Sequence, residues 1–137
     1  MRKANYDKFP STKLTGMLVQ GWDAIISVLK KQMDARKVLA VDLYTGVYEE
    51  EVLDAFSKEF SGRVMNVRDL MKPEKEIQTL TERFMTEDVL FGYVTNLKLE
   101  DYLDADKVAA ARKQISEAKE TIVIIGTGAA VVAPQDA

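Results

Sequence analysis

The stretch TIVII at residues 121–125 decides the fold, because it is the clearest strand in the sequence. Its residues are uncharged and β-branched, which is the composition of a strand that is buried on both faces. The stretch VLAVDL at residues 38–43 is also a near-continuous apolar run, and VMNV at residues 64–67 is a shorter one. Such runs are typical of parallel sheets. We therefore predict that the three segments are parallel neighbours in one sheet.

Helical segments alternate with these strands. The first carries an apolar stripe with spacings of three and four residues, formed by Trp22, Ile25, Ile26, Leu29 and Met33. The others are predicted to start near residues 49, 74 and 105, after acidic, Pro or Asp start signals. Together the elements predict an α/β fold, a three-layer αβα arrangement of the P-loop/Rossmann-like kind, with a mostly parallel sheet and helices on both faces.

Three further features carry structural expectations. Residues 13–19 alternate weakly and are predicted as an edge strand. Residues 89–94 fit either a strand that is interrupted at Gly92 or a loop with a short helix. Gly62 is predicted as the C′ residue of the second helix. We expect residues 1–137 to form a single α/β domain, and the turn-and-helix start at residues 126–130 suggests the N-terminal fragment of a longer protein.

Composition excludes several classes of function. The 137 residues are 47% hydrophobic and 30% charged, with a net charge of −3, and a pI near 5.1. This balance argues against a nucleic-acid partner, which requires clustered Lys and Arg. The chain has no Cys and no His, so thiolate chemistry, the commonest zinc ligands and Ser-His or Cys-His catalysis are excluded. We assign no catalytic residue and no metal ligand.

The N-terminal sequence lacks the pattern of a signal peptide. Residues 1–3 are basic, but polar residues follow where an apolar run would be required. The longest apolar stretches, at residues 122–125 and 129–133, fall far short of about 20 residues. We expect a cytoplasmic protein without a membrane partner.

A candidate ligand site lies at the carboxyl ends of the strands, where open α/β sheets bind ligands. Turns that offer backbone amides and hydroxyls follow the strands at residues 38–43 and 121–125. Two interpretations remain open, ordinary glycine turns and a contact to a nucleotide or a small anion. The residues of this candidate site are Asp42, Thr45, Gly46, Gly126, Thr127 and Gly128.

The surroundings of this site favour a weakly charged ligand. The phosphate-loop pattern ends in Gly-Lys-Ser/Thr, which residues 42–46 lack. Glu49, Glu50 and Glu51 stabilise the start of the predicted helix but repel a phosphate. Because these three carboxylates are negatively charged, a neutral sugar or nucleoside is a more favourable ligand there than a triphosphate.

Three segments of the sequence carry a family resemblance. ANYDKFP at residues 4–10, QGWDAI at residues 20–25 and IIGTGAA at residues 124–130 resemble the N-terminal region of long bacterial mannose-6-phosphate isomerase-like proteins, the phosphomannose isomerase-like group. In that family, such a region precedes a cupin-type isomerase module. The resemblance covers most of the chain. It implies a role in carbohydrate phosphate metabolism and the C-terminal cupin-type isomerase module of the same protein as partner.

The resemblance carries over no catalytic residue. The family binds zinc through His, Glu and Gln, whereas this chain has no His, so we expect no cofactor in it. The leading interpretation is a non-catalytic, accessory N-terminal domain. A degenerate kinase-like domain that binds a nucleotide or a sugar phosphate is the alternative, and a structural interaction module is a further one.

Overall fold

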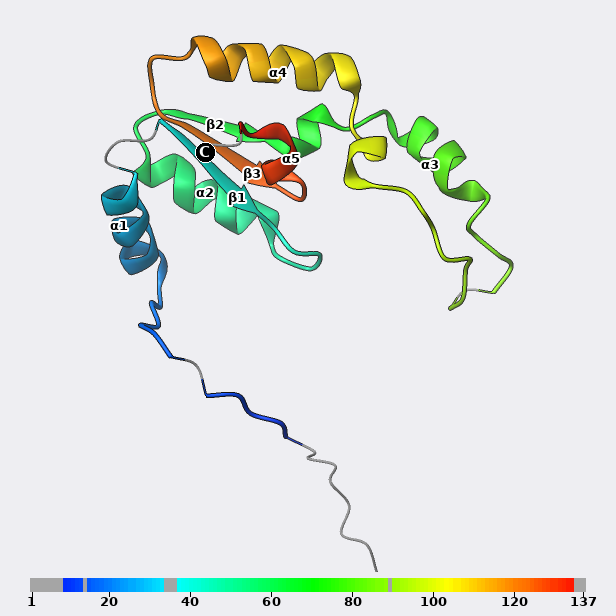
Figure 1. Cartoon of the computed structure of the whole chain (residues 1–137), viewed down its shortest axis with the longest axis horizontal. Coiled ribbons are helices and arrows are strands. Elements are labelled where there is room, and N and C mark those ends of the chain that lie inside the picture. Colours follow the sequence, from blue (N-terminus) through cyan, green and yellow to red (C-terminus); the bar gives the residue numbers. More distant parts are fainter. Residues whose placement is uncertain (1–8, 14, 34–36, 89, 135–137) are drawn as a thin grey trace, which may run out of the picture.

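The computed structural model describes residues 9–13, 15–33, 37–88 and 90–134. Helices and strands alternate along most of this length (Figure 1). The elements are α1 (Trp22–Gln32), β1 (Val38–Asp42), α2 (Glu49–Glu59), β2 (Arg63–Asn66), η1 (Val67–Leu70), α3 (Glu74–Glu82), η2 (Leu99–Tyr102), α4 (Ala105–Glu117), β3 (Ile122–Gly126) and α5 (Ala129–Val132).

The fold is mixed α/β with a small three-stranded parallel sheet. Its strand order is β1-β3-β2, so the last strand lies between the first two. Ile122 lies opposite Val38 on one side and Arg63 on the other, and both pairings are parallel. The prediction of three parallel neighbours is therefore confirmed. Both faces of β3 are covered by helices, which explains why its sequence is apolar throughout. Its central position leaves it fully buried, whereas β1 is only partly buried.

Helices pack on both faces of the sheet, around two separate cores. Alternate residues of β3 point to opposite faces. The α4-side core contains Ile122 and Ile124, together with Val67, Leu70, Leu103, Ala111, Ile115, Ala129 and Val132. The α2-side core contains Val123 and Ile125, together with Ile26, Val52, Phe56 and Phe60. Each large apolar side chain that is buried in this way contributes roughly 1.5–3 kcal/mol.

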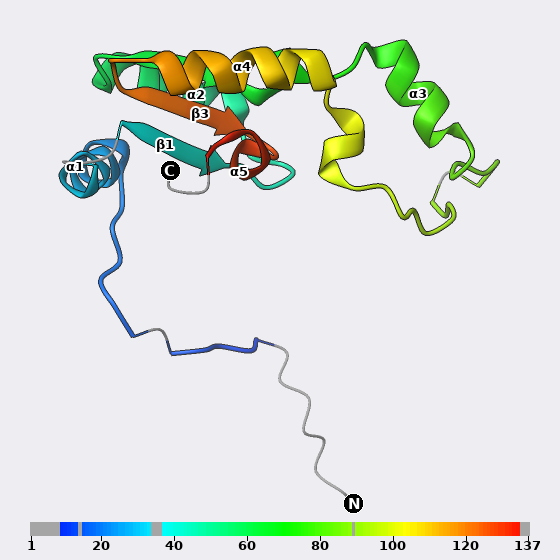
Figure 2. The same cartoon turned by 45° about the horizontal axis from the view of Figure 1, so that its top comes forward.

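The predicted starts of the four helices are confirmed, but the predicted position of α3 is wrong. The helices begin at Trp22, Glu49, Glu74 and Ala105. Figures 1 and 2 both show α3 beyond the end of the sheet and not on one of its faces. None of its residues is buried, although Ile77 and Leu80 are partly covered. An apolar stripe predicts a helix but does not specify what the stripe will contact.

Two of the weaker expectations are also settled. Residues 14 and 89 lie outside the described residues, and the described parts of 13–19 and 89–94 contain no strand. A local network makes the second segment a loop: the amide of Tyr93 donates to the carbonyl of Phe84 at 2.8 Å. The Asp88 side chain accepts hydrogen bonds from the amides of Leu90 and Phe91. Short-range bonds of this kind replace the ladder that a strand would need.

The prediction that Gly62 is a helix C′ residue is wrong. The helix α2 ends at Glu59, and its C-cap Phe60 is already extended. Gly62 is instead required by a close approach, because a Cβ atom on it would lie 2.1 Å from the carbonyl oxygen of Thr121. The neighbouring amide of Arg63 donates to that same oxygen at 2.9 Å. Gly62 therefore lets the start of β2 reach the chain that leads into β3.

Among the described residues, no helix has the length and apolar character needed to cross a membrane.

Candidate functional site

The carboxyl ends of β1 and β3 lie side by side and lead to different faces of the sheet. Asp42 at the end of β1 is paired in register with Gly126 at the end of β3. The helix after β1, α2, packs in the α2-side core, whereas α5 after β3 packs in the α4-side core. Neighbouring strands whose connections diverge in this way define a topological switch point, which is the usual place for a ligand in an open α/β sheet.

The turn after β3 depends on two glycines. Gly126 and Gly128 have φ values of 137° and 88°, a region that other residues rarely adopt. A Cβ atom on Gly126 would also lie 2.8 Å from the Cβ of Val67. The backbone can therefore leave the sheet and enter α5 within two residues.

The Asp42 carboxylate holds this turn. Its Oδ1 accepts a 3.0 Å hydrogen bond from the amide of Gly128, and its Oδ2 accepts a 3.0 Å bond from the amide of Ala130. The hydroxyl of Thr127 donates to the carbonyl of Leu43 at 3.0 Å, and the amide of Leu43 donates to the carbonyl of Gly126 at 3.3 Å. The carboxylate therefore already accepts the hydrogen bonds that these two backbone amides could otherwise donate to a bound anion.

The structure separates the predicted site residues into two groups. Asp42, Gly126, Thr127 and Gly128 lie together, as the two strand ends require. Thr45 and Gly46 form a turn between β1 and α2. The connection between these two elements extends past the sheet (Figure 1). In the described part of the chain no hydrogen bond joins either residue to the turn, and a Cβ atom on Gly46 would meet nothing within 4 Å. The loop is closed locally by a 3.2 Å bond from the amide of Val47 to the carbonyl of Tyr44.

Sequence reasoning missed three contributors to this site. They are the carbonyl of Leu43, the amide of Ala130 and the side chain of Leu99, whose Cδ1 would lie 3.9 Å from a Cβ atom on Gly128. An Asp at the end of a strand is a common acceptor for nearby backbone amides, which is the one signal that the sequence offers. The donors are 86 and 88 residues away, so no local pattern identifies them.

One of the three glutamates near the site has a structural partner. Glu51 accepts a 3.1 Å hydrogen bond from Nε1 of Trp22 and so connects the start of α2 to α1. The Trp22 ring meets the Phe56 ring edge to face, with the centroids 6.4 Å apart. Within the described residues, Oε1 of Glu49 is shielded from solvent and has no hydrogen-bond partner. All three carboxylates nevertheless remain at the start of α2, where they favour the helix and oppose an anion.

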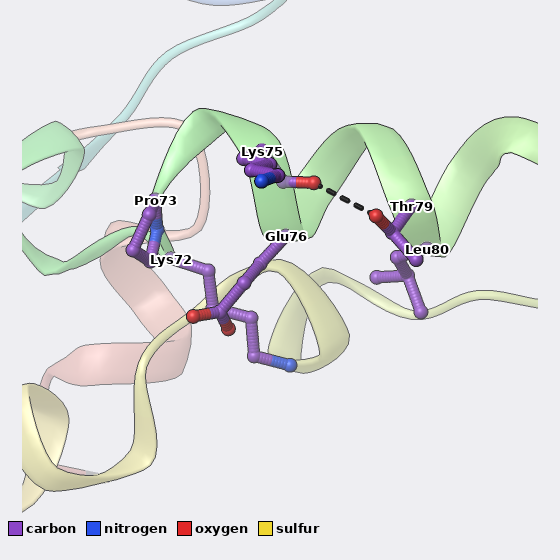
Figure 3. A pocket seen from close by; sticks show the side chains of 6 residues that line it. All are labelled: Lys72, Pro73, Lys75, Glu76, Thr79 and Leu80. Carbon is purple, nitrogen blue, oxygen red and sulfur yellow. Dashed lines mark hydrogen bonds between the residues drawn. The ribbon is translucent and has the colours of Figure 1, made fainter.

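One surface hollow of the described residues lies beside α3, away from the switch point. A pocket of about 540 Å³ lies beside α3, and Figure 3 shows its lining residues Lys72, Pro73, Lys75, Glu76, Thr79 and Leu80. Two of its polar side chains have local partners: Thr79 donates to the carbonyl of Lys75 at 3.0 Å, and Nζ of Lys72 donates to the carbonyl of Asp101 at 2.7 Å. These bonds support the chain itself and identify no ligand.

The acidic residues do not form a metal centre in the part of the chain that the structure describes. No three Asp or Glu side chains there are grouped so that they could hold a metal ion. The chemistry available at the switch point is therefore that of one carboxylate, one hydroxyl and the backbone groups of a glycine turn.

Comparison with known proteins gives a family assignment. Neither the curated proteins nor the solved structures include a significant match. Residues 21–137 match the model of a family described as "Domain of unknown function (DUF8485)". This match includes every helix and strand of the fold and both turns of the candidate site. The chain therefore belongs to the DUF8485 family.

Proposed function

We propose that the chain is a non-catalytic, accessory N-terminal α/β domain of a mannose-6-phosphate isomerase-like protein of carbohydrate phosphate metabolism. In this proposal it acts in the cytoplasm, and its partner is the C-terminal cupin-type isomerase module of the same protein. The resemblance of residues 4–10, 20–25 and 124–130 to that group of proteins supports the family context.

The observation that carries the non-catalytic role is the position of Asp42. Its carboxylate accepts hydrogen bonds from the amides of Gly128 and Ala130, so these donors already have an anionic acceptor. An incoming phosphate would have to displace this carboxylate and would meet its charge at short range. The absence of His and Cys from the sequence removes the thiolate nucleophile, the imidazole base and the commonest zinc ligands. The groups at the switch point are therefore better suited to stabilise the fold than to catalyse a reaction.

The proposal includes the finer fold class. The parallel sheet has helices of both cores on its two faces, which supports a three-layer αβα arrangement of the P-loop/Rossmann-like kind. Such sheets serve in many proteins as scaffolds whose functions differ, so the fold by itself selects no activity.

The experiment for the leading proposal is an isomerase assay on the purified chain. Interconversion of mannose 6-phosphate and fructose 6-phosphate is measured with and without added zinc, beside an active mannose-6-phosphate isomerase as positive control. We expect no turnover above the buffer rate in either condition. Zinc-dependent turnover that co-elutes with the chain on gel filtration, and that persists in an isomerase-deficient expression host, would contradict the proposal.

A second candidate function is a degenerate kinase-like domain that binds a nucleotide or a sugar phosphate. The observation that favours it is the location of Asp42 and Thr127 at the switch point between β1 and β3. A carboxylate at this point accepts hydrogen bonds, so the hydroxyl groups of a sugar or a ribose suit it better than phosphate oxygens.

Amide NMR distinguishes the two candidates. The chain is titrated with ATP, mannose 6-phosphate and mannose. Under the leading proposal, we expect no saturable change in the amide chemical shifts of residues 126–130. Saturable shifts there that are lost in Thr127→Val but retained in Thr45→Val would favour the binding domain, because Thr45 lies in the separate loop and serves as the matched control.

A further inference from the structure

We propose that the outer edge of β1 accepts a fourth parallel strand, delivered from the C-terminal end of α5. The occupant is an extended apolar segment that continues the same polypeptide, so the inference rests on the proposal of a longer protein. It does not depend on what that longer protein catalyses.

Among the described residues, no backbone hydrogen bond is made to the outer side of β1. The carbonyl of Lys37 accepts from the amide of Ile122 at 2.7 Å, and the amide of Leu43 donates to the carbonyl of Gly126 at 3.3 Å. In a parallel ladder, the residues that bond to one neighbour alternate with those that face the other way. The odd-numbered residues 37–43 therefore face β3, and the backbone groups of Val38, Ala40 and Asp42 face outward. Their N–H and C=O groups could form a parallel ladder with an added strand.

The two edges of the sheet differ in how they are protected. β2 has only four residues and begins with Arg63, whose Nη1 donates to Oε1 of Gln114 at 2.9 Å. Short edge strands and charges are the usual protection against further pairing. β1 has four uncharged apolar residues, and the charge of Asp42 at its end is directed to the amide of Gly128. Its apolar residues are only partly buried, whereas those of β3 are fully buried. β1 is thus the edge that lacks protection.

The connections already present determine the side to which the chain would run. The connection from β1 to β2 passes through α2 on one face, and the connection from β2 to β3 passes through α4 on the other. The two run in opposite directions across the sheet on opposite faces, so they have the same hand, as the right-handed crossover rule requires. The helix α5 follows β3 on the same face as α4. A crossover of the same hand must then continue in the direction from β2 through β3 to β1, and the first free position on that path is the outer edge of β1.

The two cores define the chemistry of the occupant. On one face of β1, Val38 and Ala40 pack at the margin of the α4-side core. On the other face, Leu39 and Val41 pack at the margin of the α2-side core. A strand beside β1 would extend both cores, so both of its faces must be apolar, as in β3.

The experiment supplies such a strand to the chain. A Gly/Ser linker of roughly six residues and the segment Thr-Val-Ile-Val-Tyr-Val are fused after Ala137. The matched control carries the same linker and a segment with Pro at alternate positions, which cannot form a ladder. Hydrogen exchange of single backbone amides is followed by NMR. We expect exchange at Ala40 and Asp42 to slow by at least about tenfold in the strand fusion relative to the control. The outward amides of Val64 and Asn66 on β2 should exchange equally in both.

The substitution Ala40→Pro tests the same edge from the other side. The N–H group that it removes points away from β3, and Pro is tolerated in edge strands at such positions. We expect the fusion to lose its protection of Asp42 in this variant. Equal exchange at Ala40 and Asp42 in the strand and control fusions would overturn the inference, and so would protection that appears at Val64 and Asn66 instead. Neither result depends on isomerase activity, so failure here is distinguishable from failure of the proposed function.

Discussion

The side chain of Asp42 and the backbone amide of Gly128 are joined by a 3.0 Å hydrogen bond across 86 residues of sequence. This bond connects the end of the first strand to the turn that follows the last one. Because the same carboxylate also accepts from Ala130, one side chain fixes both the exit of the chain from β3 and the start of α5.

Removal of this carboxylate should destabilise the fold. Hydrogen bonds that involve a charged group contribute roughly 1.5–3 kcal/mol, and less where solvent competes. We expect Asp42→Ala to lower the free energy of unfolding by about 1–2 kcal/mol, measured by urea denaturation. The matched control is Asp54→Ala in α2, because Asp54 is exposed and makes no hydrogen bond in the described structure. Equal effects of the two substitutions would contradict the role given to Asp42.

Gly62 and Gly46 should respond differently to a methyl group. A Cβ atom on Gly62 would lie 2.1 Å from the carbonyl oxygen of Thr121, so the backbone would have to move. We expect Gly62→Ala to cost more than about 2 kcal/mol, as overpacking does in a tight site. Gly46 has a φ of 94° but an open surrounding, so Gly46→Ala should cost only about 1–2 kcal/mol of backbone strain. The comparison of their urea midpoints is the test, and a larger loss at Gly46 would show that the close approach is not the reason for Gly62.

Phe56 and Phe91 make a matched pair of aromatic residues. Phe56 is 2% exposed and stacks on Phe60 with the ring centroids 5.4 Å apart, whereas Phe91 is 71% exposed. We expect Phe56→Ala to lower the free energy of unfolding by about 3–5 kcal/mol, and Phe91→Ala to change it by less than about 0.5 kcal/mol. Thermal unfolding followed by circular dichroism measures both. A substantial loss at Phe91 would mean that its loop contributes to the stability of the core.

The position of α3 away from the sheet can be tested with two isoleucines. Ile115 of α4 is buried in the α4-side core, whereas Ile77 of α3 is only partly covered. We expect Ile115→Ala to cost about 2–5 kcal/mol and Ile77→Ala to cost less than about 1 kcal/mol in the urea-induced transition of the sheet and its helices. If both substitutions shifted this transition equally, α3 would have to belong to the same cooperative core.

The sequence by itself determined the elements of this protein. The apolar runs at residues 38–43 and 121–125 predicted parallel strands, because only strands covered on both faces have no polar side. Helical periodicity and start signals located the beginnings of four helices, since these are properties of neighbouring residues. The glycines of the turn at residues 126–128 were identified for the same reason, because a positive φ is a local requirement.

Only the tertiary structure decided which of these elements meet. It placed β3 between β1 and β2, put α3 beyond the sheet and made Gly62 a point of close approach to Thr121. It also made the carboxylate of Asp42 the acceptor for the amide of Gly128 and left Thr45 and Gly46 in a separate loop. Each of these outcomes depends on residues that are distant in the chain. The pattern within a segment shows that a face will be buried, but only the packing of the whole fold selects its partner.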